Sequence, residues 1–456
     1  MYSQNLISSN EVRYRLNRGY EEPILELRDD EKFDHIISTY INGGHMYILG
    51  ATRSGKTELI KLIWIRLFRK QDASVVVFDP HGDLALQLAK LTDDKKDIIF
   101  IDPTLKNGFT PTINPLRLKK KMRNETTIAI IAQELISAFE SIIGQEFSPN
   151  MEVLLTIIIY TLLRKGDANI DDILRFLDGD EGLIQLAMQS PIKAHVNFMK
   201  EQFSKQKFSK TKDALSTKIQ LLLNNPIFSN FITGDSTFDL EKALNNKKFI
   251  IFRLPKGKMR KTLEPAAKLI MALINGIVFK RSEIADKNLR PKTYLICDEY
   301  QNFFSDISDE MLSESAKNNL FILGAHQHLS QLTVKSRDGL MSAASVKIVG
   351  RNAIKDLKVM SEELDVDVEL LKKLKQGEFY IKNGSFIALK VITTDKYLDN
   401  NIAISNEQWK RHLKYQRKCF YRKVVNTVKV QNLSSPEVNS VNDLPSLPIP
   451  SFDIKD

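Results

Sequence analysis

The chain has 456 residues, of which 43% are hydrophobic and 27% charged, and its formal net charge at pH 7 is +10. This composition is typical of a soluble globular protein, and the length excludes one ordinary core, so we expect one large domain with an insertion or two domains. The two cysteines, Cys297 and Cys419, form neither a disulfide framework nor a metal-ligand spacing, which favours a reducing cytoplasm. The basic excess favours a polyanionic partner, although a solvated basic surface explains it equally well.

No stretch of the sequence is expected to cross a membrane, because none reaches the ~18–20 apolar residues that a spanning helix needs. The nearest candidate, residues 153–163, is followed by Arg164 and Lys165 and is predicted to be a buried helix. Residues 1–22 are polar and mixed, unlike a signal peptide. We therefore expect a cytoplasmic protein without membrane insertion of its own.

The first clear motif along the chain is a phosphate-binding loop. Residues 1–40 hold only short alternating stretches and are predicted to form an N-terminal lead-in. An apolar strand at 46–49 then precedes residues 50–57, which fit the pattern G-x-x-x-x-G-K-[ST], and a helix is expected over 58–68. Strand, loop and helix together indicate a true P-loop and disfavour a glycine-rich turn that only joins two elements.

The residue types in this loop predict how it binds ATP. Gly50 and Gly55 let successive backbone N–H groups turn toward the phosphates, at the positive end of the helix that follows. Lys56 is expected to bridge the β- and γ-phosphates, and Thr57 to give its hydroxyl to Mg²⁺. The predicted nucleotide-binding residues are Gly50, Ala51, Thr52, Arg53, Ser54, Gly55, Lys56 and Thr57.

Strands and helices alternate after the P-loop, which predicts a doubly wound, mostly parallel α/β sheet. Residues 73–78 are a continuous apolar run that ends in the sequence DPHGD at 79–83, and residues 97–102 form another short strand. A polar cluster at the carboxyl end of a parallel strand lies where such sheets bind ligands. The motif at 79–83 is therefore expected near the nucleotide.

A helical region interrupts this pattern between residues 116 and 245. Apolar residues recur there at helical spacing, which predicts an all-helical domain inserted into a sheet domain made of residues 41–115 and 246–395. Lysine-rich runs at 117–123 and 200–218 could touch phosphates, but a solvated helix face is the favoured explanation for each.

The second strong motif follows an apolar strand over residues 293–298. That strand ends in Asp298 and Glu299, and a P-loop enzyme needs acids at this position opposite its phosphate loop. Asp298 is expected to hold Mg²⁺ through its water shell, and Glu299 to polarise the attacking water. A helix-capping pair is the alternative, disfavoured because the two motifs occur in the right order.

A further buried strand is predicted over residues 320–325, followed by a polar tip. Gln327 can both donate and accept hydrogen bonds, so it could sense the γ-phosphate or orient the water. His326 and His328 face the opposite side at strand spacing and are expected to be structural or near DNA rather than metal ligands. Another strand at 345–350 ends before Arg351, and the turn Asn383-Gly384 predicts a hairpin over 377–391.

The C-terminal part departs from the α/β pattern. Residues 409–423, within a basic segment at 396–432, contain no acid and interleave aromatic with basic side chains. They predict either a basic helix that docks on the protein or a DNA contact, with no preference between the two. Residues 433–456 form a proline-rich tail that is expected to be extended or disordered and could bind a partner.

Taken together, these motifs resemble the HerA/FtsK superfamily of DNA-pumping ATPases, and within it the TraD-like conjugative coupling proteins of type IV secretion. The resemblance covers residues 40–395 and is carried by the P-loop, DPHGD, the helical insertion, the segment ICDEYQ, GAHQ and the later GRNAIKD. It implies a RecA-like motor domain that assembles as a homohexameric ring. It also implies that ATP is hydrolysed at subunit boundaries to move double-stranded DNA through the pore.

The sequence departs from that family in two respects. Membrane-bound coupling proteins begin with transmembrane helices, and none is predicted in this sequence. The chain is therefore expected to be a soluble relative or to dock on a membrane-anchored secretion or conjugation partner at the inner face of the membrane. The arginine that reaches into the neighbouring subunit's ATP is replaced by Lys317, which cannot make a planar bidentate contact. Either Lys317 or Arg351 is therefore the expected trans residue, with Arg351 preferred.

Two functional hypotheses follow. The first is a DNA translocase, of which a viral genome-packaging motor is a variant that the sequence leaves open. The second is an ATPase that hands over protein cargo in a secretion assembly, with the proline-rich tail as bait. Salt-sensitive stimulation of ATP hydrolysis by duplex DNA separates the first hypothesis from the second.

Overall fold

The computed structural model describes residues 44–91, 97–144, 147–303, 312, 314–384, 388–393 and 403–424. The predicted lead-in at 1–40 and the proline-rich tail at 433–456 lie outside these described residues.

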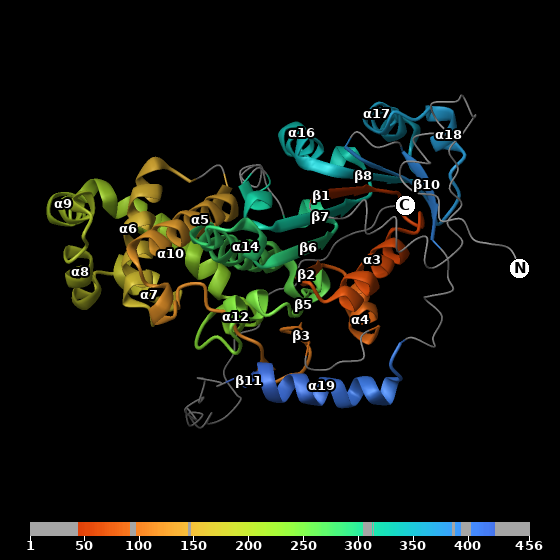
Figure 1. Cartoon of the computed structure of the whole chain (residues 1–456). Helices are drawn as coiled ribbons and strands as arrows, with labels where there is room; N and C mark the ends of the chain where they lie inside the picture. Colours follow the sequence, from red (N-terminus) through yellow and green to blue (C-terminus); the bar gives the residue numbers. More distant parts are fainter. Residues whose placement is uncertain are drawn as a thin grey trace, which may run out of the picture. The chain divides into compact units, whose positions relative to one another are not determined.

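One large sheet organises the described chain (Figure 1). Its nine strands follow the order β10-β9-β8-β1-β7-β6-β2-β5-β3. From β8 to β3 all neighbours are parallel, and only β9 and β10 are antiparallel, as the sequence predicted. The strands are β1 (His45–Leu49), β2 (Ala73–Asp79), β3 (Ile98–Ile101), β5 (Phe249–Arg253), β6 (Lys292–Asp298), β7 (Leu320–His326), β8 (Ala344–Gly350), β9 (Glu378–Asn383) and β10 (Leu389–Ile392).

Helices cover both faces of the sheet, and β2 shows how one strand serves two cores. Val75 and Val77 belong to the core that includes α3 (Lys56–Lys70) and α4 (Asp83–Lys90). Val76 and Phe78 point to the other face, into the core built on α14 (Leu263–Phe279). Because successive side chains of a strand alternate between faces, a continuous apolar run is what a strand buried on both sides requires.

The insertion predicted between the strands is helical in the structure. After the short strand β4 (Phe109–Thr110), the chain forms α5 (Glu125–Ile143), α6 (Pro149–Lys165), α7 (Asp171–Leu177), α8 (Glu181–Met188), α9 (Lys193–Glu201), α10 (Ser209–Leu223), α11 (Pro226–Ile232) and α12 (Leu240–Asn245) before β5 begins. The division of the chain into separate domains at 116 and 245 stays a prediction.

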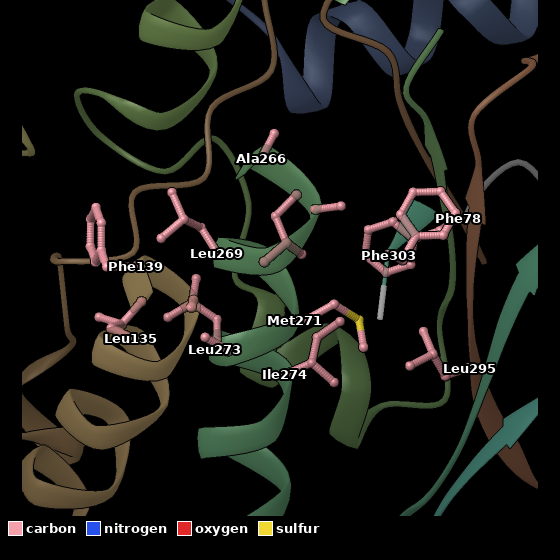
Figure 2. Packing of buried hydrophobic residues seen from close by; sticks show 14 of the residues in the cluster. Phe78, Leu135, Phe139, Ala266, Leu269, Met271, Leu273, Ile274, Leu295 and Phe303 are labelled. Carbon is pink, nitrogen blue, oxygen red and sulfur yellow. The ribbon is translucent and has the colours of Figure 1, made fainter. Parts of the chain in front are cut away.

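Helix α14 joins these helices to the sheet. Figure 2 shows Leu273 of α14 on the side of Leu135 from α5, while Met271 lies on the side of Leu295 from β6. Nearly every residue from Leu263 to Val278 is buried, so α14 is apolar all round because it has protein on both sides. The helical region and one face of the sheet therefore share one continuous core.

Two segments correct the expectation that no stretch is apolar enough to span a membrane. Glu125–Ile143, which is α5, and Lys256–Glu283, which contains α14, meet the length and composition of a spanning helix. In the second segment 89% of the most apolar window is buried inside the protein, against 39% in the first. α14 is therefore hydrophobic because it is a buried helix of the protein core. The predicted candidate at 153–163 lies within α6, whose residues there are mostly buried.

The basic C-terminal segment forms α19 (Asn406–Phe420), which docks on the free edge of the sheet (Figure 1). β3 is one of the two edge strands of the sheet, and the side chain of Gln416 forms hydrogen bonds to it of the kind that a further strand would form. Its Oε1 accepts from Phe100 N over 2.9 Å, and its Nε2 donates to Ile98 O over 2.8 Å. The following β11 (Arg422–Lys423) pairs with β4. Of the two predictions for this segment, the docking helix is the one that these contacts support.

The remaining helices at the other end of the sheet are α16 (Val334–Ala343), α17 (Ile354–Leu364) and α18 (Val368–Lys372). A one-turn helix, α13 (Lys256–Met259), follows β5. Because the strands from β8 to β3 are parallel, their carboxyl ends meet at one edge, which is where the functional residues converge.

Candidate active site

A cavity of about 310 Å³ lies at the carboxyl edge of the sheet. It receives residues that follow the ends of β1, β6, β7 and β2. These strands are far apart in the sequence, but the order of the sheet places them side by side. Its lining comprises Ala51, Thr52, Arg53, Ser54, Gly55, Lys56, Thr57, Glu58, His81, Asp298, Glu299, Gln327 and Gln376. The P-loop and the acid pair predicted from sequence therefore share one cavity.

The P-loop curls between β1 and α3 in the backbone conformation that the glycine pattern predicts. Gly55 has a φ of 100° and Arg53 a φ of 63°, both in the left-handed region. Gly55 also packs closely, since a Cβ there would lie 3.0 Å from backbone atoms of Gly377. Backbone hydrogen bonds from Gly50 N to His326 O and from Ala51 N to Arg351 O fix the start of the loop.

Lys56 supplies a buried positive charge to the cavity. Burial lowers the pKa of its ammonium group, while the charges of Glu299 and Asp298 act in the opposite direction. Its Nζ lies 3.9 Å from Glu299 Oε1. The cavity thus holds a buried cation beside two carboxylates, charges that a phosphate group and a divalent cation, respectively, can complement.

Asp298 is the last residue of β6 and Glu299 follows it directly, but the two acids have different environments. Burial raises the pKa of Asp298 to about 6; the Lys56 charge opposes the shift, and the charges of Glu299 and Asp79 add to it. Glu299 adopts a left-handed backbone conformation with φ of 54°, which is costly for a residue other than glycine. Asn302 holds it there, because its N and Nδ2 both donate to Glu299 O, over 2.9 and 3.1 Å.

Two amide side chains hold the carboxylate of Glu299. Gln327 Nε2 donates to Oε1 and Gln301 Nε2 donates to Oε2, each over 2.7 Å. Burial alone would raise the pKa of Glu299, but these two hydrogen bonds and the charge of Lys56 outweigh it and lower the pKa. The carboxylate is therefore kept ionised and oriented, as a residue that polarises water requires.

Gln327 connects this carboxylate to the P-loop. Its Oε1 accepts from Thr52 Oγ1 over 2.8 Å while its Nε2 donates to Glu299. Its backbone is also fixed, because its N donates to Gln331 Oε1 over 2.9 Å and Asn352 Nδ2 donates to its O over 2.8 Å. A side chain held in this way can respond to a group that enters between the P-loop and Glu299.

The two histidines beside Gln327 have structural contacts. His326 is fully buried, hydrogen-bonds through Nε2 to the Tyr47 hydroxyl, and through Nδ1 to His328 O over 3.1 Å. Burial, with the charge of Lys56, lowers the pKa of His326 to about 4, so the ring is neutral. His328 lies 3.3 Å from Asp356 through Nδ1 and Oδ2. These contacts of His326 and His328 hold the turn that carries Gln327. They agree with a structural role, which was one of the two predictions for these histidines.

The two candidates for the trans residue lie outside the cavity of their own chain. Arg351 has an exposed side chain, and its carbonyl accepts from Ala51 N. Lys317 is also exposed and pairs with Glu314 over 2.9 Å. Both positions stay predictions, because a trans residue acts on the nucleotide of another subunit.

Four cavity or neighbouring residues were not singled out as site residues from the sequence: Glu58, which follows the P-loop directly, His81, Gln301 and Gln376. His81 belongs to the DPHGD motif, where Asp79 fixes the turn by accepting from His81 N over 2.9 Å and Ala85 N over 2.7 Å. Gln301 could have been found from the sequence, because it stands only two positions after Glu299, in the turn that follows β6. No feature of the sequence marks Gln376. It reaches the P-loop because the N–H of Gly377 donates to Ser54 O over 2.8 Å.

The residues present fit a divalent cation. Asp298 is a carboxylate whose pKa is raised chiefly by burial, with further contributions from the charges of Glu299 and Asp79, so a nearby cation would relieve the negative potential there. It lines the same cavity as the Thr57 hydroxyl, the other predicted Mg²⁺ ligand. Carboxylate and hydroxyl oxygens are the ligand types that Mg²⁺ prefers.

A P-loop, an acid pair beyond a parallel strand, and a RecA-like sheet define a P-loop ATPase. The family model described as "Helicase HerA, central domain" matches residues 37–274, and the chain belongs to this family. No curated protein sequence matches the chain. The predicted resemblance to the HerA/FtsK superfamily is thus confirmed.

Solved structures of related fold agree with this assignment. The plasmid coupling protein TrwB, in complex with the non-hydrolysable ATP analogue ADPNP, superposes with a TM-score of 0.52 at 18% identity, over 84% of this chain and 92% of TrwB. VirB4 of Thermoanaerobacter pseudethanolicus gives a TM-score of 0.51 at 16% identity, over 77% of this chain and 89% of VirB4. At these identities the likeness establishes the RecA-like fold.

Proposed function

We propose that the chain is an ATP-driven DNA translocase that pumps double-stranded DNA as a ring-shaped homohexamer, in conjugative transfer or a related DNA-mobilisation system. The observation that carries the proposal is the hydrogen-bonded bridge from Thr52 of the P-loop through Gln327 to Glu299, in a chain of the HerA helicase family. That bridge links nucleotide binding to the residue that polarises water. The net charge of +10 suits a polyanionic cargo.

The cavity residues divide the chemistry among them. The P-loop N–H groups and Lys56 bind the β- and γ-phosphates of ATP. Thr57 and Asp298 would hold Mg²⁺, which when bound neutralises phosphate charge and orients the phosphates. Glu299 polarises the attacking water, kept ionised by Gln301 and Gln327.

Gln327 then serves as the sensor of the nucleotide state. A γ-phosphate beside Lys56 competes for the donors and acceptors that Gln327 now shares with Thr52 and Glu299. When the γ-phosphate leaves after hydrolysis, the hydrogen bonds that join Gln327 to Thr52 and Glu299 form again. The turn that carries Gln327 transmits this change to β7 and α17. In a ring, Arg351 or Lys317 of a neighbouring subunit would complete the site.

The proposal is tested by ATP hydrolysis with and without duplex DNA over a range of salt concentrations. A translocase shows duplex-stimulated hydrolysis that falls as salt rises, because phosphate contacts are screened and counterions compete. Hydrolysis that duplex DNA leaves unchanged at low salt would contradict the proposal and favour the hand-over of protein cargo. The same preparation, imaged with ATP and duplex DNA, shows whether rings form.

A DNA pump in conjugative transfer works at a membrane channel, so we propose a cytoplasmic protein that docks on a membrane-anchored secretion or conjugation partner. The measurement is a pull-down with the full chain. The partner should be retained at low salt and released by a high-salt wash.

A further inference from the structure

A second cavity lies beside the active site, at the carboxyl end of β5. Its volume is about 350 Å³, and its lining comprises Lys256, Arg260, Lys261, Leu263, Glu264 and Asn302. β5 is parallel to β2, whose end carries His81 of the active site, so both cavities lie at the same edge of the sheet. The two linings share no residue.

The wall of this second cavity carries a concentration of positive charge. Residues 256–261 contain four cations and no acid, and three of these cations, Lys256, Arg260 and Lys261, line the cavity. The side chains of Lys256, Lys258, Arg260 and Lys261 are exposed, and none of them forms an ion pair with a residue in the described part of the chain. Glu264, a carboxylate in the lining, is paired with Lys268 over 2.5 Å. The cavity therefore offers uncompensated cations to an anion.

The backbone of this segment is held in place, so the cations are presented from a fixed loop. Leu254 N donates to Asp79 O over 3.1 Å, and Lys256 N donates to Pro80 O over 2.9 Å. Met259 is fully buried beneath the loop. Arg260 has a φ of 50° and a ψ of −123°, a conformation that residues other than glycine keep only where the surroundings enforce it.

A short hydrogen-bonded path connects the basic loop to the catalytic carboxylate. Lys256 Nζ donates to Asn302 Oδ1 over 3.5 Å. Asn302 in turn donates from its N and its Nδ2 to Glu299 O. The same Asn302 thus lines the basic cavity and holds Glu299 in its left-handed conformation. An anion that attracts the Lys256 ammonium group removes its hydrogen bond to Asn302, and Asn302 is the residue that positions Glu299.

We propose that the basic cavity binds backbone phosphates of the nucleic-acid cargo and that Asn302 transmits its occupancy to Glu299. This inference rests on the proposed DNA translocase function and names the place where the cargo stimulates hydrolysis. Clustered lysine and arginine side chains contact phosphates without reading bases, which a pump that moves any sequence requires. The path through Asn302 gives DNA binding a direct effect on the active site.

A matched pair of variants of the full chain tests the binding step. Arg260→Gln with Lys261→Gln removes two cations from the cavity, and Lys414→Gln with Lys418→Gln removes two exposed cations from α19. Binding of a fluorescein-labelled duplex is measured by anisotropy against salt. The cavity variant should bind about tenfold more weakly or worse at low salt, with a salt slope smaller by about 2. The α19 variant should match the unmodified protein, and equal melting temperatures verify that both are folded.

Hydrolysis measurements test the transmission step. Without DNA, the cavity variant should hydrolyse ATP at the unmodified rate, and saturating duplex should stimulate it only weakly. Asn302→Ala should bind the duplex normally but lose the stimulation. Full stimulation of Asn302→Ala would overturn the transmission through this residue.

The outcomes separate this inference from the proposed function. If the unmodified protein binds and responds to duplex DNA but the cavity variant does so equally well, the phosphate site is wrong and the translocase stands. If the α19 variant loses binding instead, the DNA contact moves to that helix. If the unmodified protein neither binds duplex nor is stimulated by it, the proposed function itself is wrong.

Discussion

The side-chain amide of Gln327 donates to Glu299 Oε1 over 2.7 Å, which joins the tip of β7 to the acid that follows β6. The oxygen of the same amide group accepts from Thr52 of the P-loop, so one side chain connects the P-loop to the acid pair. This connection explains how the presence of a γ-phosphate can reach the residue that polarises water.

Replacing Gln327 with leucine should reduce the turnover number for ATP about 10²–10³-fold, a loss of the size seen when one positioned polar group is removed from a catalytic site. ATP binding should change little, because Lys56 and the P-loop amides are retained. Steady-state hydrolysis and binding of a fluorescent ATP analogue provide the two measurements. Gln220→Leu, an exposed change on α10, is the control and should have no effect. Unchanged turnover in Gln327→Leu would exclude Gln327 from the chemistry.

Replacing Gln301 with leucine should move the acid limb of the pH profile of turnover to higher pH. Gln301 lowers the pKa of Glu299 by donating to the ionised carboxylate, although burial acts in the opposite direction. Without this donor, burial is opposed less, the pKa rises, and the carboxylate becomes ionised only at higher pH. A profile that keeps its shape and position while turnover falls would show that Gln301 acts only on the fold.

The raised pKa of Asp298 predicts a pH-dependent affinity for Mg²⁺. Burial raises this pKa to about 6, so the carboxylate becomes protonated as pH falls through that value and can no longer bind the cation. The Mg²⁺ concentration for half-maximal hydrolysis should therefore rise steeply below pH of about 6. Asp298→Asn should need more Mg²⁺ than the unmodified protein above that pH, and its Mg²⁺ requirement should no longer change through that range. An unmodified protein with constant Mg²⁺ requirement across that range would contradict the metal assignment.

Replacing Gln416 with leucine should destabilise the fold at the edge of the sheet. The change leaves Phe100 N–H and Ile98 C=O without their partner, and each buried unpaired group costs about 1–3 kcal/mol. We expect the free energy of unfolding in urea to fall by about 2 kcal/mol or more. Lys414→Leu, exposed on the same helix, is the control. Equal loss in both variants would mean that the hydrogen bonds to β3 are not the cause.

The sequence predicted the sheet and the acid pair because both carry strong local signals. A continuous apolar run such as that of β2 is diagnostic of a strand buried on both faces, and glycine spacing identifies a P-loop. Asp298 and Glu299 could be placed opposite it because carboxyl ends of parallel strands meet at one edge. These inferences need only a strand and the motif at its end.

Other features depend on contacts between distant segments and had no local signal. Gln376 enters the cavity because Gly377 is hydrogen-bonded to Ser54, which no spacing in the sequence indicates. The docking of α19 rests on Gln416 pairing with β3, whereas the basic composition of the helix suited a DNA contact equally well. The apolar character of α14 was also underestimated, since a helix packed between a sheet and other helices can be as hydrophobic as a membrane segment.

The most direct test of the account compares ATP binding and hydrolysis by the unmodified protein and Glu299→Gln. The glutamine keeps the size of the side chain but cannot polarise water as an ionised carboxylate does, so ATP should bind with similar affinity and remain uncleaved. We predict that Glu299→Gln retains bound ATP while its turnover number falls at least about 10²-fold. Hydrolysis by Glu299→Gln at the unmodified rate would contradict the central claim that Glu299 activates the attacking water.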